Sequence, residues 1–123
     1  MRTQRSEKNL KALEKLQSWT ATAHFVSTAW RAGSVPKAYT TDALDLAGEQ
    51  VREKSGQFRQ APLLPSELRP QLPGHVERIE YIITRLAGAV KRGDKDAAAQ
   101  EEQQLAVEQQ VLASLRSRTR ASP

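Results

Sequence analysis

The sequence contains no cysteine, and aromatic residues make up only 5% of its 123 residues. Without cysteine the chain has no disulfide framework, no thiolate metal ligand and no cysteine nucleophile. Long hydrophobic runs are also missing. The best candidate, residues 20–32, is interrupted by threonines, Ser27 and His24 and falls short of the ~20 apolar residues that a membrane span needs. We therefore expect a cytoplasmic protein that does not contact a membrane.

The composition favours helices. The chain is 38% hydrophobic and 27% charged, and it is rich in Ala, Leu, Glu, Gln, Lys and Arg, which are the residues that lose least in a helix. A chain of this length buries roughly two thirds of its surface, which is enough for one core. Both features predict a single all-α domain over residues 1–123.

Four segments carry apolar residues at steps of three and four, the spacing of an amphipathic helix. We expect helices over about residues 6–32, 34–60, 75–92 and 95–116. Gly33 and Gly93 are placed to end the first and third helices, and Asp94 to cap the fourth. The apolar stripes include Leu16, Trp19, Val26 and Trp30; Leu44, Ala47, Val51 and Phe58; Val76, Ile79, Ile83, Leu86 and Val90; and Leu105, Val111, Leu112 and Leu115.

Residues 61–74 hold Pro62, Pro65, Pro70 and Pro73, which remove backbone donors and disfavour helix before each proline. This segment is the predicted Pro-rich linker between the second and third helices, and its leucines favour an ordered wrap over the bundle. The basic arm, residues 1–5, and the tail, residues 117–123, are expected to fray.

The simplest way to bury four such stripes is an antiparallel up-down-up-down four-helix bundle. A three-helix core, or a bundle completed by a second copy of the chain, remains an alternative at this point.

Three large apolar residues fall off the stripes on a helical wheel of about 100° per residue. They are Phe25, Leu46 and Tyr81. We expect them to anchor another protein or a second copy, because aromatic residues are enriched at interaction hot spots. The alternative is that they are isolated surface residues, which are common on soluble proteins.

The net charge is +5, and basic residues cluster near both chain ends. An up-down-up-down bundle brings those ends to one pole, which could bind phosphate through a salt-sensitive electrostatic attraction. A nonspecific nucleic-acid-binding protein is therefore the alternative function, although nearby acidic residues dilute the pole. Its candidate contacts are Arg2, Arg5, Lys8, Lys11, Arg116, Arg118 and Arg120.

Glu101 and Glu108 lie on the apolar stripe of the fourth helix, where a buried carboxylate could be functional. A metal or haem bundle is a second alternative, but the Glu-x-x-His pair of di-iron bundles is missing. The simpler interpretation is that both carboxylates reach the bundle edge. We predict no catalytic residue, no metal ligand and no cofactor, and a bundle that acts by protein–protein contact as an adaptor, regulator or subunit.

Overall fold

The computed structural model describes residues 4–60 and 72–121, with side chains described for residues 10–58 and 72–117. These residues form four helices: α1 (Gln4–Arg31), α2 (Lys37–Gln60), α3 (Leu72–Arg92) and α4 (Lys95–Ala121). No β-strand occurs in the described ranges. The predicted all-α four-helix bundle is confirmed.

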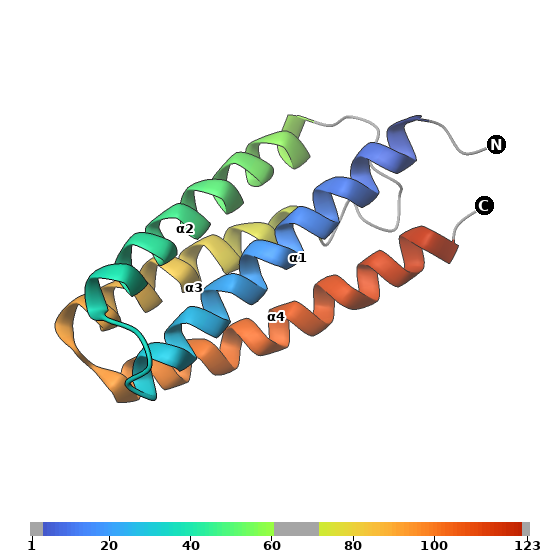
Figure 1. The fold of residues 1–123 in the computed structure, drawn as a ribbon. Coiled ribbons are helices and arrows are strands. Elements are labelled where there is room, and N and C mark those ends of the chain that lie inside the picture. Colours follow the sequence, from blue (N-terminus) through green and yellow to red (C-terminus); the bar gives the residue numbers. More distant parts are fainter. Residues whose placement is uncertain (1–3, 61–71, 122–123) are drawn as a thin grey trace.

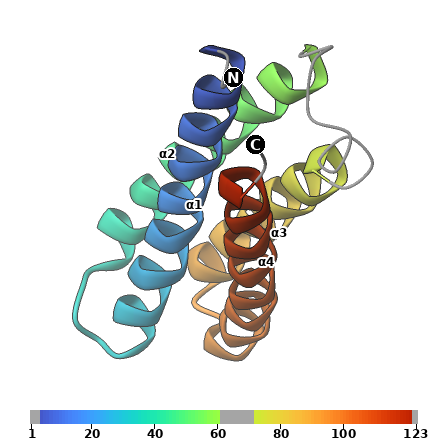
Figure 2. The same ribbon diagram turned by 90° about the vertical axis from the view of Figure 1, so that its right-hand side faces the viewer.

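The helices are arranged around a square. Helices α2 and α4 each pack against both α1 and α3, whereas α1 and α3 lie across the diagonal and barely touch. In Figure 1, α1 and α3 run in one direction and α2 and α4 run in the other, so the first turn of α1 and the last turn of α4 are at the same end. Figure 2 shows α1 and α4 side by side along the bundle. The first and last helices of the chain therefore lie side by side on one face of the bundle.

Two short turns close the opposite end of the bundle, and they have the same geometry. Gly33 and Gly93 adopt φ angles of 80° and 71°, a backbone conformation that glycine adopts without steric cost. After each glycine the next amide reaches back five residues, from Ser34 to the Ala29 carbonyl and from Asp94 to the Ala89 carbonyl, both at 2.8 Å. Asp94 Oδ1 then accepts the Ala97 amide at 3.0 Å. Both predicted stops and the predicted cap are confirmed.

The predicted stripes form the core. All five α3 stripe residues are buried, as are Leu44, Ala47, Val51 and Phe58 of α2. On α1, Trp30 is buried, whereas Trp19 is half-buried at the core edge. The polar residues Lys54 and Ser55 are also buried, where the α2 stripe lacks an apolar residue.

Several predicted boundaries are wrong. Helix α2 begins at Lys37 instead of residue 34, with the Pro36 carbonyl accepting the Thr40 amide. Helix α3 begins at Leu72, so the predicted linker extends too far along the chain. The reason is that a proline such as Pro73 is tolerated in the first turn of a helix. The other linker residues, 61–71, lie outside the described part.

The ends of the chain are also more helical than predicted. Helix α1 begins at Gln4, and α4 continues past Arg116 to Ala121. No helix breaker occurs in this stretch, and arginines are favoured near the negative end of a helix. Across the described residues, no helix combines the length and apolarity needed to cross a membrane.

Candidate functional site

The three off-stripe residues are exposed. The exposed fraction is 73% for Phe25, 45% for Leu46 and 61% for Tyr81, and Tyr39 and Val107 are the other large hydrophobics exposed among the described residues. Their exposure agrees with the wheel, whereas their role in binding stays a prediction.

Tyr81 lies apart from the other two. It belongs to α3, diagonally opposite the α1 helix that carries Phe25. The Arg85 guanidinium lies 5.5 Å from the centre of its ring, and Arg85 Nη1 donates to the Tyr81 hydroxyl at 3.3 Å. Tyr81 therefore lies beside Arg85 on another side of the bundle, and the three predicted residues do not form one surface.

Phe25 and Leu46 lie on neighbouring helices, together with Tyr39 of α2, which the sequence reasoning missed. Tyr39 and Leu46 are seven residues apart and so share one side of α2. That side is about 160–180° around the helix from Gly48, which faces Ile83 of α3. Tyr39 and Leu46 are therefore on the α1 side of α2. We call Phe25, Tyr39 and Leu46 the hairpin patch. The seven-residue spacing of Tyr39 and Leu46 is the feature of the sequence that could have identified Tyr39 as part of it.

Of the predicted basic pole, the structure describes the side chains of Lys11 and Arg116. Lys11 is exposed. Arg116 points to α1, where Nη2 lies 3.2 Å from Glu14 Oε1 and Nη1 lies 3.3 Å from Gln17 Oε1. This arginine is engaged within the fold. The side chains of Arg2, Arg5, Lys8, Arg118 and Arg120 lie outside the described part, so the pole stays a prediction.

Three glutamates of α4 are buried, and each contacts a cationic or basic side chain of a neighbouring helix. Sequence reasoning identified Glu101 and Glu108 but missed Glu102, which is only 3% exposed. Glu102 is hard to identify from the sequence, because it lies at the side of the α4 stripe and because its partner Arg31 is 71 residues away in the chain.

Glu102 joins α4 to the last turn of α1. Arg31 donates twice to its carboxylate, from Nε to Oε2 and from Nη2 to Oε1, both at 2.8 Å. The Ser27 hydroxyl donates to Oε2 at 2.6 Å and the Thr28 hydroxyl to Oε1 at 3.0 Å. Burial by itself raises the pKa of Glu102, but these donors and the positive charge of Arg31 together lower that pKa below its usual value. The carboxylate is thus held ionised inside the bundle.

Glu101 and Glu108 pair with α3. Arg85 Nε donates to Glu101 Oε2 at 3.0 Å. Glu108 Oε1 lies 2.7 Å from His75 Nδ1, and Glu108 Oε2 lies 3.7 Å from Arg78 Nη1. Among the described side chains, no three His, Asp or Glu residues gather as metal ligands would. Each carboxylate instead holds two helices together.

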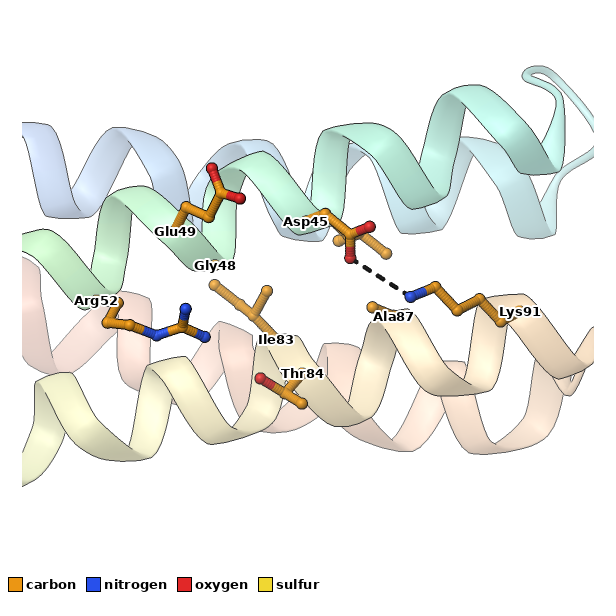
Figure 3. A pocket seen from close by; sticks show the side chains of 9 residues that line it. Asp45, Gly48, Glu49, Arg52, Ile83, Thr84, Ala87 and Lys91 are labelled. Carbon is orange, nitrogen blue, oxygen red and sulfur yellow. Dashed lines mark ion pairs between the residues drawn. The ribbon is translucent and has the colours of Figure 1, made fainter.

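A groove of about 280 Å³ runs between α2 and α3 (Figure 3). Its floor is apolar, and the Ile83 side chain extends from α3 toward Gly48 (Figure 3). The ion pair of Lys91 Nζ with Asp45 Oδ1, at 3.6 Å, crosses it (Figure 3), and Arg52, which also lines it, pairs with Glu80 of α3 at 2.8 Å. This face of the bundle is therefore strongly charged, with cations and anions already paired across the groove.

Comparison of the chain with protein-family models, curated proteins and solved structures gives no match in any of the three.

Proposed function

We propose that this protein is a non-catalytic helical bundle that acts by binding another protein, as an adaptor, regulator or subunit, in the cytoplasm. The observation that supports this proposal is the hairpin patch, in which three large apolar side chains stand exposed on two adjacent helices. Neighbouring exposed apolar groups mark interaction sites more often than isolated ones do.

The absence of charge around Phe25 in the sequence supports the same proposal. Phe25 lies within residues 16–30, where the chain contains no Lys, Arg, Asp or Glu. A partner that covers Phe25 therefore desolvates few charges, and that desolvation is the main energetic cost of burying a polar surface. Aromatic anchors surrounded by uncharged residues are typical of the centre of a protein interface.

The experiment has two steps. A photo-reactive amino acid at position 25 or 46 identifies the proteins that cross-link in cells, with the exposed position 107 on α4 as the control. A candidate that cross-links at positions 25 and 46 is then purified, and its binding to the bundle is measured by calorimetry.

Phe25→Ser and Leu46→Ser should each weaken this binding by ten-fold or more, since a buried anchor contributes about 2 kcal/mol. Val107→Ser is the matched control and should leave the affinity unchanged. Equal affinities for all three variants, each folded by circular dichroism, would overturn the proposal.

A further inference from the structure

The charges of this bundle are segregated on its surface. Exposed charged side chains are frequent on the outer sides of α2 and α3, and they include Asp45, Glu49, Arg52, Arg78, Arg85 and Lys91. Along α4, residues 97–115 contain three charged residues, which are the buried glutamates. Every exposed side chain in that stretch is uncharged, as is every exposed side chain in residues 16–30 of α1. Since α1 and α4 lie side by side (Figure 2), these two stretches form one face of the bundle without exposed charged side chains, which we call the neutral face.

Two ion pairs mark the ends of this neutral face. At the end near the turns, Arg31 of α1 pairs with Glu102 of α4 at 2.8 Å. At the other end, Glu14 of α1 pairs with Arg116 of α4 at 3.2 Å. Positions between the two pairs follow the seam between the helices at steps of three and four. They include Gln17, Ala21, His24 and Thr28 on α1 and Ala106, Gln109 and Ala113 on α4.

The charges at the four corners alternate in sign. Along α1 the cation Arg31 is at one end and the anion Glu14 at the other, whereas along α4 the anion Glu102 precedes the cation Arg116. A two-fold axis that lies in the interface and runs across the helices places a second copy face to face with the first. This rotation puts Arg31 of one copy over Glu14 of the other, and Arg116 over Glu102.

The face is therefore complementary in charge to itself. Glu102 is buried beneath its partners and Arg116 is engaged with Glu14 and Gln17, so the contact across the interface depends on Arg31 and Glu14, whose side chains are 34% and 39% exposed. An isologous interface needs this kind of self-complementarity.

We propose that two copies of this chain pair through the neutral α1–α4 face, with the small residues Ala21, Ala106 and Ala113 along the centre of the interface. Short side chains let two helices approach closely, since the distance between packed helices depends on the side chains at the contact. The residues at the centre of this interface do not belong to the hairpin patch, so the pairing can fail without overturning the proposed function.

The area of the neutral face indicates how tightly two copies should bind each other. Seventeen residues separate Glu14 from Arg31, which is about 25 Å of helix, and two helices are about 20 Å wide. The resulting area of about 500 Å² per copy is smaller than the ~800 Å² that a standard stable interface buries on each side. The dimer should therefore form at micromolar concentration and dissociate on dilution.

Sedimentation equilibrium of the full chain between about 1 µM and 1 mM tests the pairing. We expect the apparent mass to rise from that of one chain toward that of two. Ala21→Lys and Ala21→Glu each place a charge at the centre of the interface, and each should keep the protein monomeric at concentrations where the unmodified chain dimerises. Gln57→Lys and Gln57→Glu, at an exposed position of α2, are the matched controls and should leave dimerisation unchanged.

An equimolar mixture of the Ala21→Lys and Ala21→Glu proteins should dimerise again, because the two new charges attract each other across the interface. Position 21 is exposed, so both variants should fold, as circular dichroism can check. An unmodified chain that stays monomeric at 1 mM, single variants that still dimerise, or a mixture that stays monomeric would each overturn the pairing.

Discussion

The Arg31 guanidinium meets the Glu102 carboxylate side-on, with two hydrogen bonds of 2.8 Å from the last turn of α1 to the first half of α4. The carboxylate is almost fully buried, and the arginine side chain is 34% exposed. Because of this difference in burial, removing Arg31 leaves a buried carboxylate without its partner, whereas removing Glu102 leaves a partly exposed guanidinium without its partner. The predictions on Glu102 below follow from it.

Replacing the glutamate should destabilise the bundle. Glu102→Ala leaves the buried Ser27 hydroxyl without its acceptor and removes the partner of Arg31, so we expect a loss of about 2–4 kcal/mol in the free energy of unfolding. Urea unfolding at pH 7 measures this loss. Asp45→Ala breaks the exposed ion pair with Lys91 and is the control, with no measurable change expected. Equal effects of the two substitutions would contradict the importance of burial.

The stability should depend on pH through Glu102. Its pKa is lower in the folded state than in the unfolded chain, so the folded protein binds this proton less readily. The stabilisation is present above the unfolded value of about 4.3 and is lost as the pH falls through the folded pKa. Glu102→Gln cannot titrate, and its unfolding free energy should fall less steeply between pH 6 and pH 3 than that of the unmodified chain. Parallel curves would show that Glu102 does not contribute to acid unfolding.

The three buried glutamates should respond differently to leucine. Glu101→Leu and Glu108→Leu bury an apolar group and leave the side chains of Arg85, Arg78 and His75, which are 56%, 62% and 23% exposed, in contact with water. Their melting temperatures should therefore be unchanged or higher. Glu102→Leu should lower the melting temperature, because the buried Ser27 hydroxyl loses its acceptor and Arg31 loses both of its hydrogen bonds to the carboxylate. Differential scanning calorimetry on the three proteins separates these cases.

Two glycines should give opposite results when replaced by alanine. A Cβ at Gly48 would lie 3.6 Å from Ile83 Cγ2, which is ordinary van der Waals contact. Gly48→Ala should raise stability by about 0.5–1 kcal/mol, because alanine is the better helix former. Gly33 also has open space around it, but its φ of 80° is strained for alanine. Gly33→Ala should cost about 1 kcal/mol or more. Chemical unfolding of both variants provides the test, and changes of the same sign would refute the conformational explanation.

The sequence was sufficient for the helices, their stripes and both tight turns. These features depend on local chemistry: the periodicity of Val76 to Val90, the left-handed conformation that glycine allows at Gly33 and Gly93, and the Asp94 side chain that caps α4. The boundaries were less accurate, because proline in a first turn and arginine in a last turn are compatible with helix.

Sequence alone could also show that Phe25, Leu46 and Tyr81 leave the stripes, since that depends only on position around each helix. It could not show that Phe25 and Leu46 lie on adjacent helices while Tyr81 is bound to Arg85 on another side. Neither could it pair Arg31 with Glu102 or Glu14 with Arg116, because these partners are distant in the chain and meet only when α1 packs on α4. Periodicity determines what each helix buries, whereas the order of helices around the core decides which charges meet and which face of the bundle is left neutral.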